Sequence, residues 1–458
     1  MNQFMIQSIL EEQRHYFKLG QMRAIDFRLE QLKKLKAMIL KYESEILLAL
    51  KMDLNKSEFE AYTTEVGFVL DSIAYISKNL EHWSKDKVVK TPLHHSFSKS
   101  IIKQEPYGVT LIIAPFNYPF QLLIEPLIGA IAAGNTAVLK PSEYTVHTEA
   151  IIIKMFAETF DDMYIKVVTG GRDVTSALIS APFDYIFFTG SVPVGKVVMK
   201  AAAENLVPFT LELGGKSPSI VHSDANVKAA AKRIAWGKFM NAGQTCIAPD
   251  YVYVHESVEP LFIEEISKNL TEFYGILPIN SPDYGRVVND RHFERLISLI
   301  DQSKVVIGGQ FDSESRYIAP TVMRNVTWDD EVMKDEIFGP ILPVLSYKSL
   351  EHVIDVITSR PKPLAFYVFS ENESIQEYLL EQISFGGGCV NDTIVHVSSP
   401  YLPFGGKGAS GIGSYHGEES FKTFSHAKSI MKKSTKFELK LLYPPYKDHV
   451  KWIRKVLK

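Results

Sequence analysis

The sequence predicts an α/β protein with two α/β domains, and three observations carry that prediction. The chain has 458 residues, which is more than a single hydrophobic core usually spans. From residue 105 onward, short apolar runs alternate with helix-forming stretches, and a second alternation begins after Gly214. Because strands that alternate with helices pair in parallel, each alternation indicates a parallel sheet of its own.

The first elements along the chain are expected to be helical. Residues 1 to about 81 are polar overall, and their apolar positions recur every three or four residues, as in amphipathic helices. In the first alternation we expect strands within residues 108–115, 136–141, 165–170 and 184–190. Helices between these strands are expected within residues 125–134, 148–160 and 173–181.

The second alternation continues to Val390. We expect helices within residues 225–240 and 260–270, on either side of a strand within residues 251–256. Two other segments, residues 88–106 and 420–434, are rich in β-branched and small polar residues and lack a helical period. We interpret both segments as strands that project from the body.

The composition narrows the function classes. Hydrophobic residues make up 46% of the chain and charged residues 22%, as in ordinary soluble proteins. The formal net charge of -3 provides no basic field for nucleic acid. Charged residues at positions 11, 12 and 14 argue against a signal peptide, and prolines and polar residues within the apolar stretch 109–139 argue against a membrane span.

Only two cysteines, Cys246 and Cys389, occur in the chain. They are too few and too far apart for a disulfide framework or a cysteine-based metal site, which indicates a reducing compartment. We therefore expect a cytoplasmic protein without a metal. Cys389 is interpreted as a small buried hydrophobe.

Two nucleotide-binding motifs are nearly present. Residues 190–196 match a phosphate-binding loop, but Val197 stands where a hydroxyl must hold magnesium, so an ATPase is not favoured. The G-x-G-x-x-G of residues 406–411 lies near the C-terminus, whereas a dinucleotide fingerprint opens the first strand–helix unit of its domain. Gly190-Ser191, between a strand and a helix, is either an anion site at a helix N-terminus or a glycine turn without a ligand.

Cys246 has a polar and flexible approach, residues 241–245, so it is either an accessible nucleophile or another buried thiol. Glu212 lies in an apolar stretch directly before two glycines and is a candidate general base with a raised pKa. Asn117, between proline–aromatic turns, is a candidate oxyanion donor. The alternative for both is an ordinary hydrogen-bonded polar residue.

Seven motifs in one order carry a family resemblance. They are PFNYP, LKPSE, FFTGSVPVG, LELGGKSP, NAGQTC, EIFGP and PFGGKGASGIG. In this order and spacing the chain resembles the aldehyde dehydrogenase superfamily over nearly its whole length. EAYTTEVGF, IAWGKFMNAGQTCIAPDYV and the tail YPPY are similar to the class three branch of fatty and aromatic aldehyde dehydrogenases. Val192 departs from the threonine that the family often has there.

The resemblance implies a set of catalytic residues. Cys246 would be the nucleophile, Glu212 the base that activates water, and Asn117 with the backbone N–H of Cys246 the oxyanion hole. Tyr118 and His396 are predicted in the aldehyde pocket.

The resemblance also implies NAD as the cofactor, with NADP possible. Lys140 and Glu143 would bind the adenine ribose hydroxyls. Gly190 and Ser191 would lie at the pyrophosphate, and Gly195 would also belong to the cofactor site. Glu336 would bind the nicotinamide ribose, and Phe338 would pack near the nicotinamide.

The implied fold has a Rossmann-like cofactor domain, an α/β catalytic domain and a small β flap that bridges two subunits. The corresponding division of the chain assigns residues 1–82 and 105–213 to the NAD-binding domain and 214–414 to the catalytic domain. Residues 83–104 and 415–440 form the bridging segments, and 441–458 form a basic C-terminal tail. A homodimer is the expected assembly.

The predicted reaction is NAD(P)-dependent oxidation of medium or long aliphatic or aromatic aldehydes to carboxylic acids, through a thiohemiacetal and a thioester on the cysteine. A coenzyme A-acylating aldehyde dehydrogenase shares the thioester and remains an alternative. A catalytically silent cofactor-binding protein is expected to lose Cys246 or Glu212, and both are present. A thiol hydrolase needs a histidine partner, and no sequence pattern pairs one with Cys246.

The C-terminal tail is basic. Residues 432–458 hold nine lysines or arginines against Glu438 and Asp448. Val450, Ile453, Val456 and Leu457 fall on one face of a short helical pattern. The tail is either a solvated extension or a weak interfacial helix that supports peripheral membrane contact and influences the chain length of the preferred aldehyde.

Overall fold

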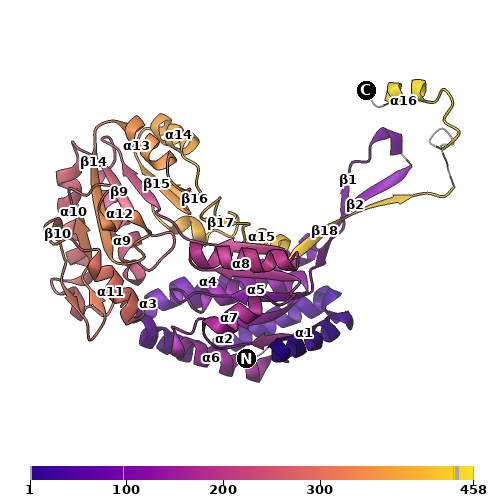
Figure 1. The fold of residues 1–458 in the computed structure, drawn as a ribbon, viewed down its shortest axis with the longest axis horizontal. Coiled ribbons are helices and arrows are strands. Elements are labelled where there is room, and N and C mark those ends of the chain that lie inside the picture. The colour runs from indigo at the N-terminus through magenta and orange to yellow at the C-terminus, as the bar shows by residue number, and fades with distance from the viewer. Residues whose placement is uncertain (1–2, 96, 437, 439–442, 457–458) are drawn as a thin grey trace.

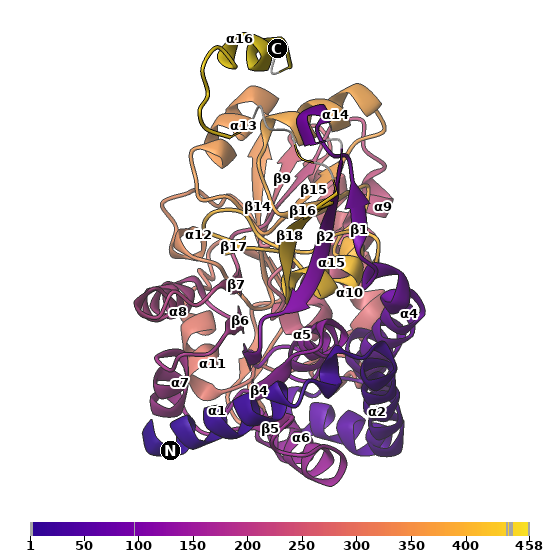
Figure 2. The same cartoon turned by 90° about the vertical axis from the view of Figure 1, so that its right-hand side faces the viewer.

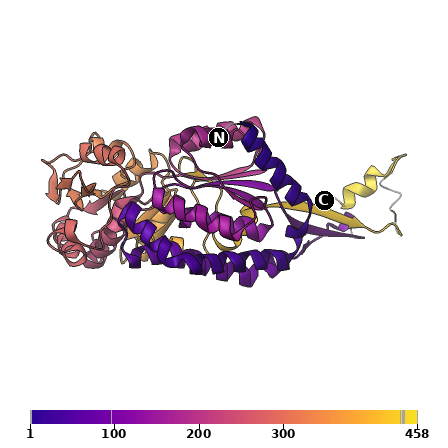
Figure 3. The ribbon, with the colours of Figure 1, turned by 90° about the horizontal axis from the view of Figure 1, so that it is seen from below.

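Two α/β bodies and a projecting three-stranded arm make up the molecule (Figure 1). The computed structural model describes residues 3–95, 97–436, 438 and 443–456. Seen from below, the two bodies and the arm lie in a row, so the molecule is elongated (Figure 3). Both predicted alternations of strands and helices are confirmed, each with its own mainly parallel sheet.

The N-terminal region is helical, as predicted. Its α-helices are α1 (Gln3–Lys18), α2 (Ile25–Leu54), α3 (Glu58–Ala61) and α4 (Gly67–Trp83), and a short 3₁₀ turn spans Gln21–Arg23. A π-helical turn, Tyr62–Val66, joins α3 to α4. One buried side of α2, including Leu32, Leu35 and Ile39, faces the core, as the period of three and four residues requires.

The first sheet has the strand order β17-β7-β6-β3-β4-β5. Its strands are β3 (Val109–Ile113), β4 (Thr136–Lys140), β5 (Ile165–Val167), β6 (Tyr185–Thr189), β7 (Phe209–Glu212) and the antiparallel β17 (Gly411–Ile412). The crossover helices are α5 (Gln121–Ala133), α6 (Val146–Thr159), α7 (Arg172–Ile179) and α8 (Val192–Glu204). The strand order reverses between β3 and β6, and ligands of such sheets bind outside the carboxyl ends at that point.

The second sheet has the order β10-β13-β14-β9-β8-β15-β16, with only β10 antiparallel to its neighbour. Its strands are β8 (Pro218–Val221), β9 (Tyr251–His255), β10 (Val305–Ile307), β13 (Thr321–Met323), β14 (Ile341–Tyr347), β15 (Ala365–Phe369) and β16 (Gly387–Val390). The helices around it are α9 (Val227–Phe239), α10 (Glu259–Tyr274), α11 (Asp290–Ser298), α12 (Glu331–Lys334), α13 (Leu350–Thr358) and α14 (Glu373–Gln382). A small hairpin pairs β11 (Phe311–Asp312) with β12 (Tyr317–Ile318).

The projecting arm is an antiparallel sheet of β1 (Lys87–Val89), β2 (Ser98–Pro106) and β18 (Ser425–Lys433) (Figure 2). The interpretation of residues 420–434 as strand was wrong at its start, because residues 420–423 belong to α15 (Gly417–Thr423). The helix forms there because Phe421 is buried in the core, against the ring of Trp83. The tail ends in α16 (Val450–Val456), whereas Leu457 lies outside the described residues.

The predicted division of the chain into domains stays a prediction. One connection between the bodies bears on it, since β17 comes after the second sheet in the sequence but pairs with β7 of the first. Across the described residues, no helix combines the length and apolarity needed to cross a membrane.

Candidate active site

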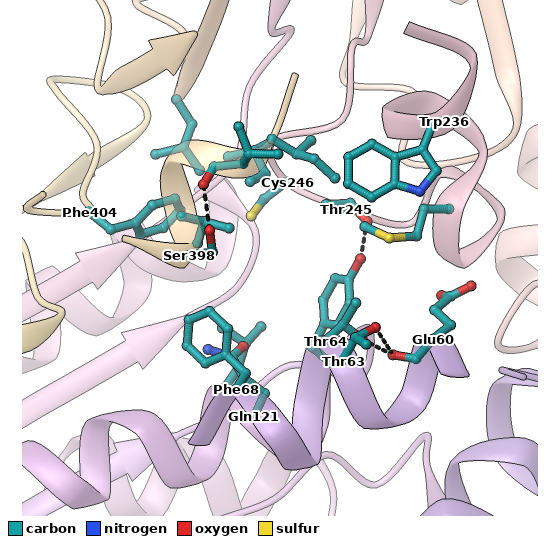
Figure 4. Close-up of a pocket in the computed structure, with 18 of the residues that line it drawn as sticks. Glu60, Thr63, Thr64, Phe68, Gln121, Trp236, Thr245, Cys246, Ser398 and Phe404 are labelled. Carbon is teal, nitrogen blue, oxygen red and sulfur yellow. Dashed lines mark hydrogen bonds between the residues drawn. The ribbon is translucent and has the colours of Figure 1, made fainter. Parts of the chain in front are cut away.

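A cavity of about 470 Å³ lies where the two α/β bodies meet. Thr189 and Glu212, at the carboxyl ends of β6 and β7, line it from the first body, and Thr245 and Cys246 line it from the second. Figure 4 shows the Cys246 side chain pointing into this space, opposite side chains of the N-terminal helical region. Most of the remaining wall is aromatic or aliphatic.

The loop that carries Cys246 is a tightly held turn after α9. Asn241, Ala242 and Gly243 have φ angles of 52°, 50° and 74°, so three residues in succession are left-handed. Gly243 must be glycine, because a Cβ there would lie 2.2 Å from the carbonyl oxygen of Gly339. Contacts with neighbouring residues therefore hold the strained turn in place. This turn places Thr245 and Cys246 at the cavity.

The environment of Cys246 favours the neutral thiol. Burial raises the pKa of the Cys246 thiol, and the charges of Glu336 and Glu212 raise it further. Both carboxyls therefore lie close enough to act on the sulfur electrostatically. Because the thiolate is the nucleophilic form, catalysis at this residue requires that the thiol proton be transferred away.

Glu212 is 2% exposed, and neither of its carboxyl oxygens has a hydrogen-bond partner among the residues that the structure describes. The hydroxyl of Thr189, its neighbour in register on β6, is equally unpaired within the described chain. Burial raises the pKa of Glu212 well above its ordinary value. A carboxyl with both oxygens free and a raised pKa is suited to accept a proton from water.

Asn117 lies on the loop between β3 and α5 and is 2% exposed. Its carbonyl oxygen accepts a hydrogen bond from Nδ2 of Asn241 at 2.8 Å, and the hydroxyl of Tyr118 lies 2.6 Å from Oγ1 of Thr245. These two bonds join the Asn117 loop to the Cys246 loop. Tyr118 lines the cavity, whereas Asn117 is not among the described residues that do.

His396 is not among the described cavity residues either, although its neighbours Val395 and Val397 are. Its Nδ1 lies 3.5 Å from Sγ of Cys389, and burial lowers the pKa of His396 to about 4. Cys389 is half-buried, and burial raises the pKa of its thiol. A neutral histidine beside a neutral thiol is not an ion-pair nucleophile, so this contact offers no second catalytic cysteine.

The residues predicted to hold the adenine ribose lie at the carboxyl end of β4. Nζ of Lys140 is 3.1 Å from a carboxyl oxygen of Glu143, and the lysine side chain is 1% exposed while that of the glutamate is 35% exposed. The buried cation therefore orients a carboxylate that still reaches solvent. A carboxylate in that position can accept hydrogen bonds from vicinal hydroxyls.

Ser191 is the N-cap of α8 and makes no side-chain capping bond. The first N–H groups of a helix have no acceptor within it, which makes the turn after β6 suitable for a cofactor phosphate. Gly190 does not offer its own N–H, because that group donates to the carbonyl oxygen of Glu212 at 2.9 Å. Gly195 allows close packing instead, since a Cβ there would lie 2.6 Å from the Leu213 side chain.

Glu336 and Phe338 lie on the loop after α12. Burial and the charge of Asp250 raise the pKa of Glu336 to about 8. Gly214 makes room for this carboxyl, because a Cβ there would lie 2.3 Å from its Oε2. Phe338 has a φ of 49° and meets the ring of Phe116 edge-on at 5.7 Å. The loop that carries them also meets the Cys246 loop, where the carbonyl oxygen of Gly339 approaches Gly243.

Two largely buried charged pairs support these loops, and neither was predicted from the sequence. Lys216 and Asp250 form an ion pair of 2.5 Å, and Asp250 accepts the N–H of Ile337, which fixes the loop of Glu336. Lys56 and Glu65 form a second pair beneath the Asn117 loop. The sequence signal for such a buried pair is a charged residue at a position where the helical period predicts an apolar one, as at Glu65.

The chain is similar to enzymes of known family. A family profile described as "Aldehyde dehydrogenase family" matches residues 5–430. The chain is 55% identical over 445 residues to 4,4'-diaponeurosporen-aldehyde dehydrogenase of Staphylococcus aureus (strain NCTC 8325 / PS 47), with 97% of each chain covered. It is 46% identical to the mouse protein named aldehyde dehydrogenase, dimeric NADP-preferring, covering 96% of this chain and 98% of that one. A solved structure described as the substrate bound state of Staphylococcus aureus AldH shares 54% identity with a TM-score of 0.98 over 100% of both chains.

Proposed function

This chain belongs to the aldehyde dehydrogenase family, and from that premise we propose that its cavity oxidises aldehydes through an acyl intermediate on Cys246. The protein is an NAD(P)-dependent enzyme that converts aldehydes to carboxylic acids. One observation carries the proposal about its mechanism: Cys246 and the unpaired carboxyl of Glu212 line the same cavity from different bodies.

The first step is attack of the Cys246 thiolate on the aldehyde carbonyl carbon, which leaves a negative charge on the carbonyl oxygen. The thiol proton goes to the carboxyl of Glu336, whose charge acts on the sulfur more strongly than that of Glu212, so Glu212 stays free to act as the base in the later step. The side-chain amide of Asn117 and the backbone N–H of Cys246 donate to the new oxyanion. Each such donor contributes about 3 kcal/mol in comparable sites.

When the oxyanion collapses, the carbonyl re-forms and hydride leaves the substrate carbon, so a thioester remains on Cys246. Bound NAD(P) would supply the acceptor for that hydride. Glu212 then takes a proton from a water molecule, whose oxygen attacks the thioester carbon and displaces the cysteine sulfur. The products are a carboxylic acid and the free thiol.

The cofactor is assigned to groups that fit it chemically. The Lys140–Glu143 pair presents a partly exposed carboxylate for ribose hydroxyls, and the first turn of α8 after Ser191 presents N–H groups for a phosphate. Glu336 would hold the second ribose, and Phe338 would pack near the nicotinamide. Together these residues would bind the cofactor and supply the hydride acceptor near Cys246.

The substrates that suit the cavity are medium or long aliphatic or aromatic aldehydes. Its wall includes Phe68, Trp236, Phe273 and Phe404, which favour an apolar chain or ring. The similarity to an enzyme named for diaponeurosporen-aldehyde supports a bulky apolar substrate. We further propose a cytoplasmic homodimer that pairs through the arm of β1, β2 and β18. Relatives named dimeric support the homodimer itself.

Figure 1 shows α16 (Val450–Val456) beside the tip of the arm and apart from both α/β bodies. Val450 and Trp452 of α16 are exposed among basic residues. We assign to it at most a peripheral, salt-sensitive contact with anionic lipid.

Trapping the acyl intermediate tests this function. The Glu212→Gln variant, mixed with NAD and an aldehyde, is expected to gain the mass of one acyl group on the peptide that contains Cys246. Cys389→Ser in the same background is the matched control and should acylate normally. Full turnover without an adduct would overturn the proposal, and acyl-coenzyme A in place of free acid, when coenzyme A is supplied, would favour the acylating alternative.

A further inference from the structure

A buried ion pair lies directly beneath the loop that carries Asn117. Nζ of Lys56 is 2.5 Å from Oε1 of Glu65, and both side chains are 0% exposed. Lys56 lies between α2 and α3, and Glu65 lies on the π-helical turn 62–66. Because a π-turn displaces the helix face locally, it is a common way to bring a side chain into a functional position.

Lys56 holds the backbone of Asn117 from below. Its ammonium group donates to the carbonyl oxygen of Asn117 at 3.0 Å and lies 3.9 Å from the ring centroid of Tyr118. Asn241, from the Cys246 loop, donates to the same carbonyl oxygen at 2.8 Å. Both lone pairs of that oxygen are therefore used, one by the helical region and one by the nucleophile loop.

Glu65 holds the other end of the same loop. Its Oε2 accepts the backbone N–H of Phe120 at 2.9 Å and that of Gln121 at 3.2 Å. These N–H groups belong to the N-cap residue and the first residue of α5, so the carboxylate lies at the helix N-terminus and complements its dipole. Residues 117–121 are thus held at both ends by one ion pair.

We propose that Lys56 and Glu65 are positioning residues for aldehyde oxidation, which hold the Asn117 amide where the oxyanion of the reaction forms. The inference rests on the proposed role of Asn117. If the ion pair only stabilised the fold, a variant that still folds without it would keep the normal rate of the chemical step. A positioning pair would change the rate of the chemical step through Asn117 alone.

The deciding variant is Lys56→Met/Glu65→Gln. It removes both charges together, so no buried charge is left unpaired, and residue 65 keeps an oxygen for the N–H groups of Phe120 and Gln121. We expect the rate of the first-turnover burst of cofactor reduction to fall by about 10- to 100-fold, with the KM for aldehyde unchanged. Glu65→Asp, which keeps the charges but shortens the reach of the carboxylate, is a second variant and should show a smaller loss.

The control is Lys304→Met/Asp330→Asn, because this pair of 2.6 Å lies at the far edge of the second sheet and is largely, though not fully, removed from solvent. It should leave the burst rate unchanged. Comparing melting temperatures of both double variants separates loss of folding from loss of rate.

A double-mutant cycle with Asn117→Ala completes the test. Asn117→Ala alone should slow the burst by about 10²- to 10³-fold, which tests the proposed function itself. In that background, Lys56→Met/Glu65→Gln should change the burst rate less than twofold. A full additional loss would overturn the positioning role while the oxyanion assignment stands, whereas a normal burst in Asn117→Ala would overturn both.

Discussion

Two buried glutamates in this protein face opposite situations. Glu65, beneath the Asn117 loop, is bonded to the ammonium group of Lys56 and to two backbone N–H groups. Glu212, at the cavity wall, has no hydrogen-bond partner for either oxygen among the described residues. Both carboxyls are removed from solvent, so the difference lies only in what the surrounding chain offers them.

The contrast distinguishes a carboxyl that holds the structure in place from a carboxyl that can take part in the reaction. A buried charge that is fully paired fixes the position of the segments around it, since moving either would leave a charge uncompensated. A buried carboxyl without partners is costly, and folding retains it at the expense of stability. Its free oxygens and raised pKa make it able to exchange a proton, so the unpaired group is where we expect the reaction.

The largest effect on the cavity that holds the unpaired Glu212 is expected from Cys246→Ser. Serine lacks a thiolate, so we expect aldehyde oxidation to fall by on the order of 10⁴-fold or more, as for nucleophile removal in other enzymes. NAD binding, measured by fluorescence titration, should be retained. Turnover close to that of the wild type would refute the assignment, and Cys389→Ser serves as the control that keeps activity.

Glu212→Gln removes the base but leaves the nucleophile. The burst of one equivalent of reduced cofactor should persist, while steady turnover falls by about 10²- to 10⁴-fold. A base must be deprotonated, so the wild-type steady rate should rise with pH through the raised pKa of Glu212, and the variant should lose that rise. Equal loss of burst and turnover would mean that Glu212 also takes the thiol proton.

Replacing each of the two glutamates by glutamine should change the free energy of unfolding in different ways. Glu65→Gln leaves the Lys56 charge buried and unpaired, so unfolding by denaturant should show a loss of about 3–5 kcal/mol. Glu212→Gln removes a carboxyl that folding keeps from ionising, so it should leave stability unchanged or higher.

The sign of the pH dependence follows from the direction of the Glu212 shift. Its folded pKa is raised, so the folded state holds the proton more tightly than the unfolded state, and wild-type stability declines as pH rises above the unfolded value of about 4.3. The advantage of Glu212→Gln over the wild type should therefore grow from pH 4 to pH 8. Equal losses in both glutamine variants would remove the contrast between paired and unpaired carboxyls.

Glu143 is the intermediate case, because it is paired with buried Lys140 yet partly open to solvent. Its carboxylate should accept a ribose hydroxyl and repel a 2′-phosphate, so NAD should be preferred. Glu143→Gln should raise the kcat/KM for NADP relative to NAD by about tenfold, the size of a single electrostatic discrimination. An unchanged ratio would count against this assignment.

The smallest effect is expected for the C-terminal tail, in which none of the described side chains is buried. Truncation after Tyr446 removes α16, whose Trp452 is exposed. Kinetics with long aldehydes should change by about twofold more than with short ones, and binding to anionic vesicles at low salt should weaken. Identical effects on both aldehydes, with no vesicle binding in the full chain, would leave only a solvated tail.

Much of this molecule follows from local patterns along the chain. The helical period before residue 81 and the apolar runs such as 184–190 predicted real elements, because burial on one face or on both leaves a periodic trace. The helix at residues 420–423 was not predicted, because the contacts that make these residues helical come from Trp83 and α5. A local pattern cannot report partners from such distant parts of the chain.

For the site, the sequence by itself determined which groups are present: a rare thiol at Cys246, a carboxyl at Glu212 before two glycines, and an amide at Asn117. Only the tertiary structure decided their states. Whether a buried carboxyl is paired, like Glu65, or left without partners, like Glu212, depends on atoms from segments far apart in the chain. Desolvation and hydrogen bonding act through space over a few ångströms, so they become defined only when those segments have packed.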